Sequence, residues 1–118
     1  MGERVLLILT RRLVLDVLKP LNPPIHELAS RLCQIDGVAW VECSVLELDR
    51  ETETIKVTLN GSNIPLRAVE AAIGEFGAAL HSVDSVMVQR QFRPLKKAAR
   101  PVAGKPSGKS GGGGAGGV

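Results

Sequence analysis

Hydrophobic and polar positions alternate along this chain with two different periods. A period of two residues is typical of a strand with one buried face, whereas a period of about 3.6 residues is typical of an amphipathic helix. The two-residue period predicts four strands, at about residues 13–18, 38–48, 54–60 and 79–89. The third of these is the clearest, because Ile55, Val57 and Leu59 alternate with polar residues.

Two helices are predicted between these strands. Their apolar stripes are Ile25, Leu28, Leu32 and Ile35 in the first helix, and Leu66, Val69, Ile73 and Phe76 in the second. Asn22 is expected to cap the first helix, with Pro23 and Pro24 in its opening turn, where a missing N–H has no cost. Pro65 opens the second helix and Gly77 ends it.

The predicted order of elements, β-α-β-β-α-β, defines the fold class. Two strand–helix–strand units joined by a hairpin make the α+β, ferredoxin-like arrangement, with an antiparallel four-stranded sheet. Right-handed crossovers place both helices on one face of the sheet. The other face is therefore predicted to be left open by the chain itself.

Charge and composition divide the chain into three parts. We expect an N-terminal extension at 1–10, a ferredoxin-like domain at 11–92 and a basic, glycine-rich disordered tail at 93–118. Before Arg93 stand nine basic residues and all twelve acidic ones, a net charge of −3, whereas six basic residues at or after it give +6. An acidic domain is no nucleic-acid platform, so only weak, salt-dependent contact through the tail is expected.

Membrane insertion and secretion are not expected. The apolar run VLLIL at 5–9 is too short for a bilayer helix or a signal peptide. Cys33 and Cys43 are too few for a disulfide framework and are predicted to be buried thiols. The simplest location is the cytoplasm.

Asp16 is an acid within an otherwise apolar strand. Leu13, Leu15 and Val17 alternate with it, so it belongs on the open face. Lys56 and Thr58 are expected beside it from the third strand. Asp84 or Ser82 is expected to approach from the fourth strand, where the sequence LHSVDSVMV does not settle which alternate positions face the open side. Three interpretations stay open: a solvated or Lys56-paired carboxylate, a subunit contact, and a divalent-cation site shared with Asp84.

The open face also carries apolar residues, and patches of this kind mark association sites. The predicted oligomer interface consists of Val14, Asp16, Leu18, Leu46, Leu48, Lys56 and Thr58. The alternative for Leu46 and Leu48 is a bulge in the second strand that turns both side chains inward.

Catalytic and cofactor signatures are missing from the sequence. No nucleophile accompanies the carboxylates, and no His-x-x-His or Cys-x-x-Cys spacing suggests zinc. His26 is expected to face solvent, and His81 is the better candidate ligand. Trp40, Phe76 and Phe92 are the only aromatic side chains and do not form a base-stacking platform.

Several phrases of the chain resemble a known family. LVLDVLKP, ELDRETE followed by IKVT, and HSVDSV look like domain of unknown function family 211, a small and largely archaeal family; the likeness covers about residues 11–90. The resemblance implies a ferredoxin-like fold and closed homo-oligomers, and it implies no activity. The positions that suggest a shared role are Asp16, Lys19, Pro20, Glu47, Asp49, Glu51, Thr52, His81 and Asp84.

The expected function is self-assembly of a non-enzymatic cytoplasmic protein through its sheet face or strand edges, with no cofactor. One alternative is a regulatory module that binds a small ligand or a divalent cation. Its expected ligands are Asp16 and Asp84, with the acidic hairpin residues Glu47, Asp49, Glu51 and Glu53. A second alternative is weak nucleic-acid contact through the basic tail residues Lys96, Lys97, Arg100, Lys105 and Lys109.

Overall fold

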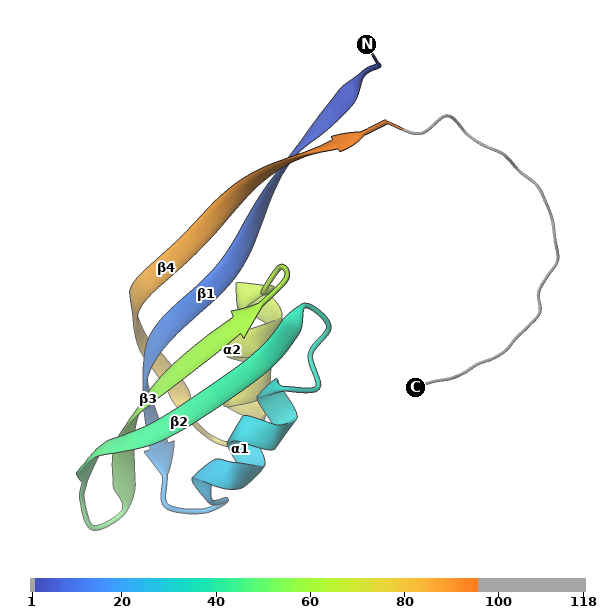
Figure 1. The fold of residues 1–118 in the computed structure, drawn as a ribbon. Coiled ribbons are helices and arrows are strands. Elements are labelled where there is room, and N and C mark those ends of the chain that lie inside the picture. Colours follow the sequence, from blue (N-terminus) through green and yellow to red (C-terminus); the bar gives the residue numbers. More distant parts are fainter. Residues whose placement is uncertain (1, 96–118) are drawn as a thin grey trace, which may run out of the picture. The chain divides into compact units, whose positions relative to one another are not determined.

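The predicted β-α-β-β-α-β order is confirmed by the computed structural model, which describes residues 2–95 (Figure 1). The elements are β1 (Arg4–Pro20), α1 (Ile25–Leu32), β2 (Val38–Leu48), β3 (Thr52–Gly61), α2 (Leu66–Glu75) and β4 (Ala79–Pro94). The four strands form one antiparallel sheet in the order β2-β3-β1-β4. The fold is therefore α+β and ferredoxin-like.

The chain divides into two compact units. Residues 7–91 form the larger one, which contains both helices and most of the sheet. In the smaller one, formed by the two ends of the chain, the N–H of Leu95 donates to the carbonyl of Glu3 at 3.0 Å. There the guanidinium of Arg4 lies over the ring of Phe92, 4.3 Å from its centroid.

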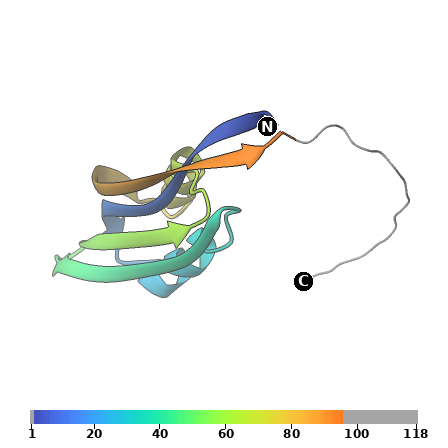
Figure 2. The same ribbon diagram turned by 45° about the horizontal axis from the view of Figure 1, so that its top comes forward.

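The core of the larger unit lies between the sheet and both helices. Leu13, Leu15 and Val17 of β1 are almost completely buried, as are Leu28 in α1 and Val69 in α2. All of them belong to one hydrophobic cluster, and both views show the two helices on the same side of the sheet (Figures 1 and 2). Burial of each such side chain contributes about 1.5–3 kcal/mol relative to exposure.

Strand register determines which residues share the opposite, open face. β1 pairs with β3 so that Asp16 lies opposite Lys56 and Val14 lies opposite Thr58. Residues directly opposite each other in an antiparallel pair point to the same side of the sheet. The neighbours predicted for Asp16 from the third strand are therefore confirmed.

Each helix begins directly after a proline, and a glycine with positive φ follows it in the chain. Asn22 is not the cap that the sequence suggested, because α1 starts after Pro24, and Pro24 holds an extended backbone without a side-chain cap. Pro65 is the N-terminal boundary of α2, as expected. Gly37 and Gly77 follow the helices with φ of 97° and 70°, a left-handed region that favours glycine.

The first and last strands of the chain, β1 and β4, are longer than predicted. β1 starts at Arg4 rather than near residue 13, because the apolar run at 5–9 continues the strand. Pairing with β3 begins only at Arg12, so β1 lacks a β3 partner before that point. Thr10 is held instead by the loop after β3: its N–H donates to Asn63 Oδ1 at 3.1 Å and its carbonyl accepts from the N–H of Ile64 at 2.8 Å.

Between residues 2 and 95, no helix has the length and apolar character needed to cross a membrane.

Candidate functional site

Asp16 lies on the open face with one oxygen that makes no hydrogen bond. The residue is half-buried, and its Oδ1 atom is fully buried without a partner. The nearby Val14 is also buried although it lies on the same face. An unpaired buried polar atom is costly, by about 1–3 kcal/mol, and native proteins contain few of them. Asp16 is therefore the residue of this face that most needs an explanation.

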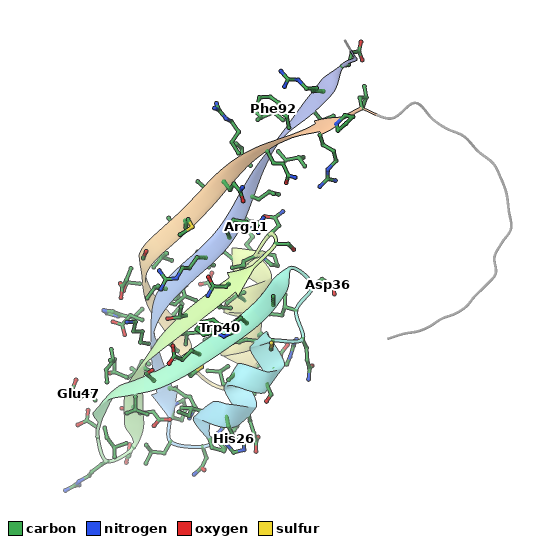
Figure 3. All side chains as sticks on the ribbon, in the orientation of Figure 1. Arg11, His26, Asp36, Trp40, Glu47 and Phe92 are labelled. Carbon is green, nitrogen blue, oxygen red and sulfur yellow. The ribbon has the colours of Figure 1, made fainter. Side chains whose placement is uncertain are left out.

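A pocket of about 330 Å³ adjoins Asp16. It is lined by Asp16 and Leu18 of β1, Thr54 of β3, Glu47 of β2 and His81 of β4. The strand register explains this grouping, because Thr54 of β3 lies opposite Leu18 of β1 and also opposite Glu47 of β2. Glu47 lies toward the hairpin end of β2, away from Trp40 (Figure 3). Four strands thus contribute to one hollow in the open face.

An irregularity in β2 brings Glu47 into this position. The pairing shifts between Val45 and Glu47, so that Leu46 has no direct partner in β3. A shift of this kind inserts one residue into a strand and redirects the side chains that follow. Glu47 consequently takes the place on the open face that unbroken alternation would have given to Leu46.

The phase of β4 decides which of its polar residues reaches Asp16. Leu80 packs against the core, so alternation places Ser82 and Asp84 on the helix side of the strand. The hydroxyl of Ser82 donates to Asp84 Oδ1 at 2.6 Å, as expected for two residues on one side. His81 therefore lines the Asp16 pocket and Asp84 does not.

The proposed cation pair must be corrected accordingly. Asp16 and Asp84, expected to share a divalent cation, are not brought together, because alternation places them on opposite faces of the sheet. Within residues 2–95, no three His, Cys, Asp or Glu side chains are grouped closely enough to hold a metal ion.

The predicted interface residues occupy different environments. Val14 and Thr58 retain only 8% and 6% exposure, so they have little surface left to bury. Leu48 lies opposite Glu53, and Glu53 points to the helix side of the sheet together with Lys19. Leu48 therefore lies on the helix side, and the expectation that it shares the open face with Asp16 was wrong. Leu18, Leu46 and Lys56 are exposed.

The bulge interpretation of the second strand is therefore half right. The irregularity exists and it changes the side on which Leu48 lies. It does not bury the leucines, however, since Leu46 and Leu48 are 60% and 66% exposed.

Lys19 and Glu53 form a buried ion pair that the sequence did not indicate. Lys19 is completely buried, and its Nζ lies 2.7 Å from Glu53 Oε2. The same ammonium group donates to the carbonyls of Pro20 at 2.7 Å and Leu21 at 3.3 Å. Its three donors are thus satisfied. Glu53, expected in an acidic ligand-binding hairpin, is instead a structural partner.

The two cysteines differ from each other. Cys33 is exposed, contrary to the expectation of burial, because it follows the last residue of α1. Cys43 is partly buried, and burial raises the pKa of its thiol from 9.0 to about 11 despite the nearby positive charge of Lys19. Cys43 is therefore a protonated thiol at neutral pH and a poor nucleophile.

Exposed apolar side chains gather on the outer strand β4, a feature that the sequence pattern did not indicate. Val86, Met87 and Val88 are consecutive, so they point to both faces of the sheet, and each is more than half exposed. Ile8 in β1 and Val83 in β4 are exposed as well. A second hollow, of about 450 Å³, lies beside them and is lined by Arg11, Asn60, Gly61, Met87, Val88 and Gln89.

The remaining candidates from the sequence have simpler surroundings. His26 is exposed in the first turn of α1, as expected (Figure 3). Trp40 lies opposite Asn60 on the open face and is about half exposed. Residues 96–118, which carry the basic tail and its expected nucleic-acid contact, lie outside the described residues.

Comparison with known proteins identifies a family and a relative of this chain. The model of the DUF211 family, described as "Uncharacterized ArCR", matches residues 11–96. The uncharacterized protein MJ0319 of Methanocaldococcus jannaschii is 37% identical over 82 residues. That alignment covers 70% of this chain and 84% of the relative.

Proposed function

The chain belongs to the DUF211 family, and we propose that it is a non-enzymatic protein that assembles into a closed homo-oligomer through the outer edge of β4. The observation that carries this proposal is the run of Val86, Met87 and Val88, each 53–57% exposed on an outer strand. The family resemblance, which implies closed homo-oligomers, points in the same direction.

The backbone of β4 supports association as much as its side chains. β4 is the last strand in the order β2-β3-β1-β4, so among residues 2–95 no further strand of the sheet pairs with the outer side of its segment 85–89. Such an edge is a template for pairing with another chain, and soluble proteins usually protect it with charge, proline or a covering segment. No charged residue interrupts the run from Ser85 to Gln89.

The occupant proposed for this edge is a second copy of the chain. In the stretch 7–11, β1 lacks a β3 partner, so this part of the sheet has only the two strands β1 and β4. Two-stranded ribbons are marginally stable in water, and a third strand from another copy would stabilise this one. A small domain also commonly gains stability by oligomerisation. Closed symmetry would then limit the assembly to a defined size.

The edge is favoured over the open sheet face as the interface. Val14 and Thr58, at the centre of that face, are already buried by their own neighbours. Asp16 and Glu47 add carboxylates, and charge is depleted from the cores of protein interfaces.

The proposal also includes a cytoplasmic location and the absence of catalysis. Both cysteines are free, and Cys33 is exposed, which suits a reducing compartment. The raised pKa of Cys43, about 11, keeps its thiol protonated and supports a structural role.

The test is the molar mass in solution of the full chain and of two variants. The wild-type protein at micromolar concentration should elute with a mass several times that of its 12.5 kDa chain. The double variant Val86→Lys, Val88→Lys adds charge to the β4 run and should dissociate to a monomer with an unchanged far-ultraviolet circular dichroism spectrum. Leu18→Lys, on the open face, is the matched control and should keep the wild-type mass.

Two results would contradict the proposal. A monomeric wild-type protein at these concentrations would remove self-assembly altogether. Dissociation by Leu18→Lys, with the mass of the β4 variant unchanged, would move the interface to the sheet face.

A further inference from the structure

The Asp16 pocket has features of a binding site that self-assembly does not explain. It is formed by side chains from all four strands, and its volume of about 330 Å³ lies at the lower end of the range for small-molecule pockets. One carboxylate oxygen of Asp16 is buried without a hydrogen-bond donor. That oxygen has no exposed surface of its own, but the Asp16 side chain lines the pocket and has no hydrogen-bond or ion-pair partner among residues 2–95, so a ligand that carries N–H or O–H groups would satisfy the carboxylate.

The charges of the pocket favour a cationic ligand. Asp16 and Glu47 both line it, and neither forms an ion pair with a side chain among residues 2–95. Lys56 lies opposite Asp16 in the sheet, but it is exposed and does not line the pocket. Two uncompensated carboxylates beside a half-buried surface attract a positive charge more strongly than they would in open water.

The arrangement fits an organic cation better than a metal ion. His81 joins the two carboxylates in the lining, yet the three groups are too dispersed to form a metal cluster within the described part of the chain. A molecule of several atoms can span groups that a single ion cannot reach together. Leu18 adds an apolar wall for a hydrocarbon stem, and the hydroxyl of Thr54 adds a further acceptor.

We propose that this pocket binds a small aliphatic amine in its ammonium form. The ammonium group donates hydrogen bonds to the carboxylate of Asp16, Glu47 adds a second negative charge that attracts it, and the carbon chain lies against Leu18. A primary alkylammonium group has three N–H donors, so the hydroxyl of Thr54, which also lines the pocket, can accept one of those that Asp16 leaves. This proposal is independent of the β4 interface, because Leu18 and Asp16 belong to the open face.

The test is titration calorimetry of the full-length protein with three organic probes, butylamine, 1,4-diaminobutane and butan-1-ol, and with calcium, magnesium and manganese chloride, each alone. Both amines should bind with a Kd on the order of 1 mM or below, as expected for so small a ligand. Butan-1-ol, which has the same chain length without the charge, should give no saturable heat. Asp16→Asn should weaken amine binding at least tenfold, whereas Asp84→Asn, which changes a carboxylate outside the pocket, should leave it within twofold.

A second readout in the wild-type protein avoids dependence on the variants. In two-dimensional amide NMR spectra, 1,4-diaminobutane should shift the signals of Leu18, Thr54 and His81 more than those of the hairpin residues Asp49 and Arg50. The proposal is overturned if no amine binds at 10 mM, if butan-1-ol binds as well as butylamine, or if Asp16→Asn binds the amines like the wild type. It is also overturned if a metal ion saturates the site while the amines do not. None of these results would bear on the oligomeric mass.

Discussion

Asp16 and Lys19, three positions apart on β1, lie in opposite environments. Lys19 lies on the helix side, where Glu53 and two backbone carbonyls satisfy its ammonium group. Asp16 lies on the open side, where one of its oxygens is buried without a donor. The first charge is fully enclosed by the fold, and the second is left for a molecule from outside. For these two residues, the face of β1 on which the side chain lies decides whether the fold itself satisfies the charge.

The largest effect should come from breaking the enclosed pair. Glu53→Ala leaves a buried ammonium group without its counter-charge, and loss of one partner of such a pair costs about 3–5 kcal/mol. The double variant Lys19→Met, Glu53→Leu removes both charges and should recover most of that loss. Urea unfolding monitored by circular dichroism measures both. A loss below about 1 kcal/mol in Glu53→Ala would show that the pair is not buried in solution.

A smaller effect of opposite sign is expected on the open face. Asp16→Val replaces a poorly satisfied carboxylate with a residue that strands favour, so the free energy of unfolding should rise by about 1–2 kcal/mol in buffer without amines. The same urea experiment measures it, with Asp84→Val as the control, since Asp84 has a hydrogen-bond partner in Ser82. Destabilisation by Asp16→Val would mean that the carboxylate is satisfied in the free protein.

The smallest effect concerns the thiol beside the core. Cys43 has a pKa raised by burial from 9.0 to about 11, so the folded protein retains a proton that the unfolded chain loses in this interval. The protonated Cys43 thiol therefore contributes fully to the free energy of unfolding below pH 9, and this contribution is lost as the pH rises toward 11. Because the thiol is only partly buried, we expect the free energy of unfolding to fall by less than about 1 kcal/mol over this pH interval.

Comparison with Cys43→Ala across this pH range isolates the contribution, since the variant should show a flatter stability curve. Below pH 9 the exposed Cys33 should also react with a thiol reagent before Cys43 does. Equal reaction rates for the two thiols would contradict the burial of Cys43.

The helix-covered face was predictable from the sequence because its pattern is uniform. In Leu13, Leu15 and Val17, and again in Ile55, Val57 and Leu59, strict alternation leaves one choice of face. The bounds of β2 were also predicted as found, at 38–48. Where a strand has one clearly apolar side, hydrophobic burial fixes its register.

The open-face site was only partly predictable. Asp16 could be assigned because its strand is regular, but LHSVDSVMV has polar residues in both phases, so burial does not choose between His81 and Asp84. Glu47 enters the pocket through a shift in pairing that no periodicity encodes. The pairing of Glu53 with Lys19 was missed because the two residues are 34 positions apart in the chain.

The three contacts of the Lys19 ammonium group also resist local opening of the sheet at one end of β3. They join the turn after β1 to the first residues of β3, which the β2–β3 hairpin connects to β2. A shear of β1 past β3 at this end would have to break an enclosed electrostatic network in one step. Local opening of the sheet should therefore start at the other end of β3, near Gly61, and amide hydrogen exchange should be fastest there.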